Sequence, residues 1–133
     1  MEKTDNKSLE QLTSIFKEKW SIDLHTYEDQ YHRTDMWFDW NGQPKDIEVK
    51  RRRFLSNRYP TTIINADKFV ELCKKKACLV VMFDDKWGIC KNVRDAFVCC
   101  TKMYARHCTD FAGDWEWSDK IELNLDKFSW YEY

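Results

Sequence analysis

The stretch NGQPKDIEVK, residues 41–50, decides how the middle of this chain folds. Asn41-Gly42 is the strongest short signal for a β-hairpin, because both central residues of a type I′ turn need a positive φ. A run rich in aromatic residues, HRTDMWFDW at positions 32–40, precedes the turn. We therefore expect two antiparallel strands joined by a two-residue turn.

The second of these strands alternates in character, and successive side chains of a strand point to opposite faces of the sheet. Ile47 and Val49 are predicted to face the core, whereas Glu48 and Lys50 share the other face. Counting outward from the turn places Asp35 directly opposite Glu48, with Cβ atoms roughly 4.5–5.5 Å apart. The pattern thus predicts two carboxylates and one ammonium group close together.

Two carboxylates this close repel each other unless a cation lies between them. Mg²⁺ is the natural candidate, because it takes one or two carboxylates and keeps waters for a substrate phosphate. Lys50 could then orient or deprotonate the attacking water, or stabilise the charged phosphorane. These groups suit metal-assisted phosphodiester hydrolysis; the alternative is a solvated sheet face with a cross-strand ion pair.

The composition indicates one globular domain. The 133 residues are enough for one core, with 43% hydrophobic and 34% charged residues. The net charge of −1 argues against a protein that simply coats DNA, but allows an enzyme that touches nucleic acid locally. No apolar run has the length of a membrane span, and residues 1–12 lack the apolar region of a secretion signal. We expect a cytoplasmic protein, in the host cytoplasm if the chain is phage-encoded, with no membrane partner.

The six cysteines include no CxxC pair and no zinc-knuckle spacing, so we expect free thiols that act as small buried hydrophobic side chains. The three histidines, His25, His32 and His107, are isolated, which gives no constellation for a Cys/His hydrolase. His32 is close enough in sequence to Asp35 to border the acidic pair, although a surface histidine is the simpler interpretation.

The flanking segments predict an α/β fold. Apolar residues recur at helical spacing over 8–20, and Ser8 has the position of the N-cap in a capping box. A short β-branched strand over 61–65 precedes a second helix, which Asn65 or Asp67 would cap. The fold expected is a mixed central sheet that starts with a β-meander and is flanked by these helices.

The remaining segments predict further strands. Residues 77–83 (ACLVVMF) form a buried strand, 84–88 (DDKWG) a turn and 89–93 (ICKNV) a returning strand. Residues 96–104 (AFVCCTKMY) fit a helix or a strand, and we favour a strand. Residues 114–120 (DWEWSDK) are loop-like, 121–125 (IELNL) are strand-like, and Asp126 would cap a last short turn.

This order of elements resembles the PD-(D/E)XK nuclease superfamily, which includes type II restriction enzymes, archaeal Holliday-junction resolvases and phage exonucleases. The similarity runs over residues 8–93, where DIEVKRRRF, YPTTIINADKF and LVVMFDDKWGI look like small phage-type members. The resemblance implies a single domain with a restriction-endonuclease-like core of order αβββαβ and a C-terminal extension over 94–133. Thr34 replaces the motif's proline, which has no chemical task.

The resemblance also implies roles for individual residues. Asp35 and Glu48 would be metal ligands and Lys50 the catalytic lysine. The carbonyl of Val49 is often a further ligand in such folds. Lys68, early in the second helix, matches a position where the superfamily commonly places a polar residue aimed at the site.

Other acids compete for the metal. Glu10 is the preferred choice for a first-helix glutamate ligand, with Glu18 as its rival. A register slip would make Asp39 the ligand in place of Asp35. The expected register instead sets Asp39 opposite Pro44, near the turn.

Three arginines follow Lys50 and are candidates for binding nucleic acid. Arg52 falls on the Glu48 face, so it could contact a phosphate. Arg51 and Arg53 point the other way, but near the strand end they can snorkel. Solubility is the simpler role for all three, but for Arg52 we favour the phosphate contact. The C-terminal aromatic residues would complete the core, form a dimer interface or stack on bases, in that order of preference: Trp115, Trp117, Trp130, Tyr131 and Tyr133.

The function expected is therefore a Mg²⁺-dependent or Mn²⁺-dependent endonuclease on DNA, with branched DNA as a candidate substrate. A homodimer is also implied, since resolvases and many restriction enzymes of the superfamily are dimers. One alternative is a catalytically inactive protein of the same fold, such as a virion component or a factor that blocks a host system. Cleavage of RNA is a third, weaker alternative.

Overall fold

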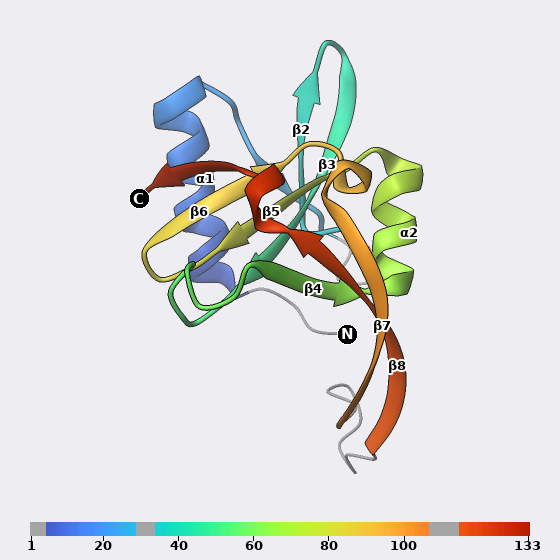
Figure 1. Cartoon of the computed structure of the whole chain (residues 1–133). Coiled ribbons are helices and arrows are strands. Elements are labelled where there is room, and N and C mark those ends of the chain that lie inside the picture. Colours follow the sequence, from blue (N-terminus) through green and yellow to red (C-terminus); the bar gives the residue numbers. More distant parts are fainter. Residues whose placement is uncertain (1–4, 29–33, 107–114) are drawn as a thin grey trace.

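The computed structural model describes residues 5–28, 34–106 and 115–133. Within these ranges the chain forms two α-helices, a six-stranded mixed sheet and a three-stranded antiparallel sheet (Figure 1). In chain order the elements are α1 (Asn6–Trp20), β1 (His25–Thr26), β2 (Met36–Trp40), β3 (Gln43–Arg51), β4 (Thr61–Asn65), α2 (Ala66–Lys75), β5 (Cys78–Met82), β6 (Lys86–Cys90), the 3₁₀ turn η1 (Val93–Ala96), β7 (Phe97–Arg106), β8 (Trp115–Asn124), the 3₁₀ turn η2 (Leu125–Lys127) and β9 (Ser129–Glu132). None of the helices described is long and apolar enough to cross a membrane.

The first helix begins earlier than predicted, and its cap is a different residue. Asp5 is the N-cap, and its Oδ1 accepts the N–H of Ser8 at 2.9 Å. Asp5 therefore satisfies an N–H that the first turn of a helix leaves without a partner. Ser8, which we predicted as the cap, is buried inside the helix.

The hairpin register is confirmed. Asn41 and Gly42 have φ values of 53° and 83°, as a type I′ turn requires. The strand pairs run from Trp40 opposite Gln43 to Met36 opposite Ile47. In this register the next residue before β2, Asp35, reaches the position of Glu48 on β3.

The main sheet is a meander extended by strands from the second half of the chain. Its order is β1-β2-β3-β5-β6-β9, and β3 and β5 are its parallel pair. The connection between β3 and β5 runs through β4 and α2. β4 leaves the main sheet and pairs with β8 in the second sheet, whose order is β4-β8-β7.

Two predictions around β6 are wrong. We expected a turn through Trp87 and Gly88, but both lie within β6, and Trp87 is 0% exposed. Burial of the Trp87 indole outweighs the turn signal of Gly88. A glycine is needed at position 88 because a Cβ there would collide with the ring of Trp130. The expected strand over 89–93 ends at Cys90, because Asn92 accepts the N–H of Arg94 and starts η1.

The C-terminal half contains more strand than we predicted. The strand expected over 96–104 is confirmed as β7, but the loop expected over 114–120 is wrong, since β8 begins at Trp115. This segment is a strand because it pairs with β7, which places Lys102 opposite Asp119 and Tyr104 opposite Trp117. The last turn is capped by Asn124 rather than by the predicted Asp126.

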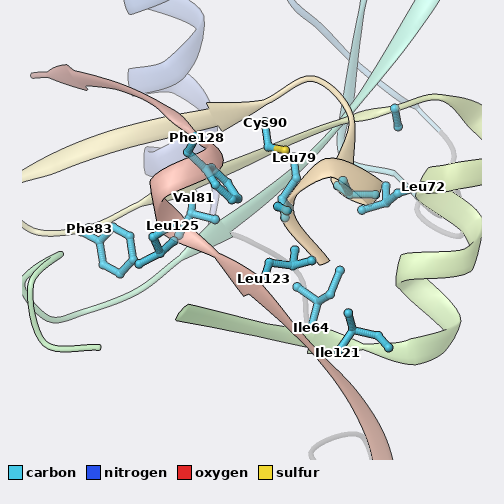
Figure 2. Packing of buried hydrophobic residues seen from close by; sticks show 13 residues of the cluster. Ile64, Leu72, Leu79, Val81, Phe83, Cys90, Ile121, Leu123, Leu125 and Phe128 are labelled. Atoms are coloured by element: carbon cyan, nitrogen blue, oxygen red, sulfur yellow. The ribbon is translucent and has the colours of Figure 1, made fainter. Parts of the chain in front are cut away.

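The core lies on both faces of the main sheet. On one face α1 packs Leu12 and Phe16 against a cluster that contains Ile47 and Val49, as predicted for these two strand residues. On the other face α2, the second sheet and η2 cover β5 and β6 (Figure 2). The cluster drawn there contains Ile64, Leu72, Leu79, Val81, Phe83, Cys90, Ile121, Leu123, Leu125 and Phe128.

The described cysteines are free thiols, but they are not all buried. Cys78 and Cys90 lie in the core, as predicted, and Cys73 and Cys99 are half-buried. Cys100 is exposed, because it lies on β7 at the edge of the second sheet. The sixth cysteine, at position 108, lies outside the described residues.

Candidate functional site

The hairpin holds the Asp35 carboxylate over the middle of β3. The N–H of Asp35 donates to the carbonyl of Ile47 at 3.1 Å, which continues the hairpin ladder by one residue. Its Oδ2 accepts the N–H of Val49 at 2.8 Å. Both anchors are backbone groups of β3, so the position of this carboxylate depends on the hairpin register.

Glu48 is a buried acid beside Asp35, with 4% of its surface exposed. Its pKa is raised to about 7, chiefly by burial and next by the Asp35 carboxylate. The ammonium groups of Lys68 and Lys50 oppose this rise. Glu48 therefore sits where a carboxylate is costly without nearby positive charge.

Lys68 supplies positive charge from the first half of α2. Its Nζ lies 3.2 Å from Oε2 of Glu48, and the two side chains are 11% and 5% exposed. The resemblance implied that Lys68 is aimed at this site, and the structure brings the two side chains together. Helix α2 can reach the Glu48 face because the β3–β5 connection crosses that side of the sheet.

Glu71 is the site residue that the sequence analysis missed. It lies one turn after Lys68 on α2 and is buried. One oxygen lies 4.0 Å from Nζ of Lys68, and the other lies 3.3 Å from Nζ of Lys75. The spacings i,i+3 and i,i+4 among these residues were a readable signal that they share one helix face.

Lys50 lies on the same face as Glu48 and is half-buried. It is paired with Val81 of β5, whose side chain faces the α2 side of the sheet. Its ammonium group lowers the pKa of Glu48, which places it within electrostatic reach of the acid.

Three of the other proposed acids lie elsewhere. Glu10 and Glu18 are exposed on α1, the helix that covers the opposite face of the main sheet from Glu48. Asp39 is opposite Pro44, and its Oδ1 accepts the N–H of Gly42 at 2.8 Å. Asp39 thus stabilises the hairpin turn, and the structure joins Asp35 rather than Asp39 to Glu48.

The three arginines make internal contacts. Arg51 donates to the carbonyl of Met82 at 2.8 Å and pairs with Asp84 at 3.0 Å. Arg52 donates to the carbonyl of Ile63 at 2.8 Å, which ties β3 to β4. Arg53 pairs with the helix cap Asp5 at 2.8 Å and has an exposed side chain. Each arginine therefore has a structural task, and of the three only Arg53 is largely exposed.

The predicted aromatic C-terminus divides into two groups. Tyr131 stacks on Trp87 and Trp130 on Phe83 and Phe128, so this end of the chain completes the core. Trp117, by contrast, is exposed on β8, and Tyr133 is exposed as the last residue. Trp115 begins β8. Of the histidines, His25 packs its ring on Trp37, while His32 and His107 lie outside the described residues.

The chemistry of this donor set fits a small divalent cation. Asp35 and Glu48 provide two carboxylates, and two is the number that Mg²⁺ commonly takes from a protein. Their mutual repulsion favours protonation of Glu48, and a cation between them would relieve it. Among residues 5–28, 34–106 and 115–133, no group of three or more His, Cys, Asp or Glu is placed to hold one metal ion. The Lys68 ammonium group would compete with such a cation for the Glu48 carboxylate.

Comparison with known proteins adds no relative. No family model, curated protein or solved structure matches this chain.

Proposed function

We propose that this protein is a metal-dependent nuclease that hydrolyses phosphodiester bonds of DNA. The observation that carries the proposal is the Asp35 carboxylate, held on the N–H of Val49 beside the buried acid Glu48. Two lysines complete the set, Lys50 from the same strand and Lys68 from α2. Two neighbouring carboxylates can hold a divalent cation, and nearby ammonium groups can stabilise negative charge on a phosphate, so this set of groups suits phosphodiester hydrolysis.

The order of the elements also supports this proposal. In chain order the structure has α1, the hairpin strands β2 and β3, then β4, α2 and β5, which is the succession of helices and strands that the resemblance implies for an αβββαβ core. There are two departures: β1 is an additional strand, and β4 pairs in the second sheet rather than in the main one. The resemblance rests on this core and on the residues it carries.

Each site residue has a role in the proposed reaction. Asp35 and Glu48 would hold Mg²⁺ or Mn²⁺, and the resemblance adds the carbonyl of Val49. A divalent cation supplies Lewis-acid chemistry, which lowers the pKa of water and offsets charge on a phosphate. Val49 fixes the direction of the Asp35 carboxylate through its N–H. Lys50 would donate hydrogen bonds to the attacking water or to the phosphate.

DNA is the proposed partner, and branched DNA is the first substrate to test. We also propose a homodimer, because two copies would present one site to each strand of a junction. Both proposals rest on the resemblance. An enzyme of this kind would act in the cytoplasm, that of the host if the chain is phage-encoded.

The test is cleavage of linear duplex, single-stranded and four-way-junction DNA, and of the matching RNA, with Mg²⁺ or Mn²⁺. We expect cleavage of DNA that is lost in Glu48→Ala and Lys50→Ala, by at least about 100-fold for the lysine. Asp39→Asn is the matched control, because it removes a carboxylate from the same hairpin but away from the site. No cleavage of any of these substrates would contradict the proposal, and so would the absence of metal binding by calorimetry.

The second candidate is a binding protein that keeps this fold without catalysis, such as a virion component or a factor that blocks a host system. Two observations favour it. The Lys68 ammonium already neutralises Glu48 at 3.2 Å, and the guanidinium groups of Arg51 and Arg52 are bonded to carbonyls of the chain itself. Calorimetry separates the candidates, since this one predicts no Mn²⁺ binding at Asp35 and Glu48.

A further inference from the structure

Lys68 lies between two buried acids that belong to different elements. Its Nζ is 3.2 Å from Oε2 of Glu48 on β3 and 4.0 Å from Oε2 of Glu71 on its own helix. The nearer acid is a proposed metal ligand, and the farther one also contacts Lys75, at 3.3 Å. A small movement of one ammonium group would exchange its acid partner.

Burial restricts where this ammonium group can go. The side chains of Lys68, Glu48 and Glu71 are 11%, 5% and 10% exposed. Moving a buried ammonium group away from a carboxylate is strongly unfavourable unless another partner replaces the carboxylate. A divalent cation that binds Glu48 therefore has to displace Lys68 to another acid, because the like charges repel at short range.

We propose that Glu71 is the second partner for Lys68, and that it lets a divalent cation bind at Asp35 and Glu48 by accepting the displaced ammonium group. This inference rests on the proposed function. Glu71 is a positioning residue in this scheme, since it acts on the cation site through Lys68.

Lys75 sets the balance between the two partners. Its Nζ lies 3.3 Å from Oε1 of Glu71, and its side chain is one-third exposed. Because it is partly solvated, Lys75 can give up part of this contact at little cost when Lys68 approaches. Helix α2 thus carries Lys68, Glu71 and Lys75 on one face, at the spacings i,i+3 and i,i+4 that keep all three side chains in contact.

The experiment is Mn²⁺ binding to the full chain, measured by calorimetry for a double-mutant cycle of Lys68→Gln and Glu71→Gln. We expect Glu71→Gln to weaken binding by about tenfold, in the range typical of outer-shell partners of a metal site. Lys68→Gln should strengthen binding, because it removes the competing ammonium. In the Lys68→Gln background the Glu71→Gln effect should vanish, because Glu71 acts only through Lys68.

Two further variants control for charge and for folding. Asp67→Asn removes one exposed carboxylate from the first turn of α2, next to Lys68, and should change Mn²⁺ affinity by less than about twofold. Lys75→Gln should strengthen binding, because Glu71 then accepts Lys68 more readily. It keeps the inference testable if Glu71→Gln does not fold.

The outcomes separate this inference from the proposed function. If Glu71→Gln weakens Mn²⁺ binding equally with and without Lys68, Glu71 acts as a general negative charge and the inference is overturned. Equal affinity in all variants overturns it as well. Mn²⁺ binding with the expected cycle but no cleavage of any nucleic acid would support the inference while rejecting the nuclease. No Mn²⁺ binding to the natural chain would reject both.

Discussion

At the scale of single residues, Glu48 decides how the site responds to pH. An acid whose pKa is higher in the folded chain than in the unfolded one favours the folded state in its protonated form. The pKa of Glu48 is raised from 4.5 to about 7 by burial and by Asp35. Its contribution to stability is therefore full below pH 4.5, falls as the pH rises toward 7, and stays low above that.

The first prediction follows from this sign. Relative to Glu48→Gln, the natural chain should lose about 1–3 kcal/mol of unfolding free energy between pH 4.5 and pH 8. Urea unfolding of both proteins at these pH values, without divalent cations, measures the difference. Asp39→Asn should give no such trend. A natural chain that gains stability over Glu48→Gln as the pH rises would contradict the assignment.

Gly88 carries the second prediction. A Cβ at this position would lie 2.9 Å from Cε3 and Cζ3 of Trp130, on the strand paired with β6. Gly88→Ala should therefore destabilise the protein by about 1–3 kcal/mol, the usual cost of overpacking, as measured by urea unfolding. Combining it with Trp130→Leu should cost less than the sum of the two single changes. Additive effects would mean that the indole moves aside freely.

Much of the acidic site could be predicted from sequence patterns close to the hairpin. The turn geometry of Asn41-Gly42 and the period of two placed Asp35 beside Glu48, because a hairpin register propagates along both strands. Glu71 could not be predicted as a site residue in this way, although the sequence shows that it lies one helical turn after Lys68. Its position near Glu48 depends on how α2 packs over β3, and this long-range contact cannot be read from the local sequence.

At the scale of elements, the ribbon of β7 and β8 departs most from the sequence prediction. In Figure 1 it extends away from the main sheet, and near its far end Tyr104 and Trp117 are 54% and 66% exposed. The first half of β8 resembles a loop in sequence because its apolar residues are few and polar residues interrupt them. A partner strand supplies the hydrogen bonds that local propensity does not reveal.

The ribbon gives the third prediction. The rings of Tyr104 and Trp117 are directly opposite each other, with centroids 5.3 Å apart. A double-mutant cycle of Tyr104→Ala and Trp117→Ala should give a coupling energy of about 0.5–1 kcal/mol in urea unfolding. A cycle of Tyr104→Ala with Trp130→Leu, at separate places, should be additive. Zero coupling across the ribbon would mean that this pair does not hold β7 to β8.

At the scale of the whole molecule, the chain after residue 93 is part of the same core as the segment before it. β9 closes the edge of the main sheet next to β6, and β8 pairs with β4. The second core cluster takes Ile121, Leu123 and Phe128 from this part of the chain. The sequence indicated the strands of this region only in part, because β8 and β9 pair with strands that lie 40–63 residues earlier in the chain.

The last prediction is that residues 1–93 do not fold alone. Removing residues 94–133 takes several buried apolar side chains out of the second core cluster: Ala96, Ile121, Leu123, Leu125 and Phe128. At about 1.5–3 kcal/mol for each large side chain, the loss is on the order of 10 kcal/mol. That is comparable to the whole stability of an ordinary domain, about 5–15 kcal/mol. The shortened chain should give no cooperative urea transition and poorly dispersed amide NMR signals.

The matched control shortens the ribbon and keeps the core. Replacing residues 103–118 by Asn-Gly leaves Lys102 opposite Asp119 across a two-residue turn, as a type I′ hairpin requires. Every member of both core clusters remains, so we expect a cooperative transition that is weakened by less than about 2 kcal/mol. If residues 1–93 unfold cooperatively as well, the site-bearing half is an independent unit, and the second sheet adds only to its surface. If only the control does, the Asp35–Glu48 site depends on residues 94–102 and 119–133, because β8 and β9 hold in place the sheet that carries it.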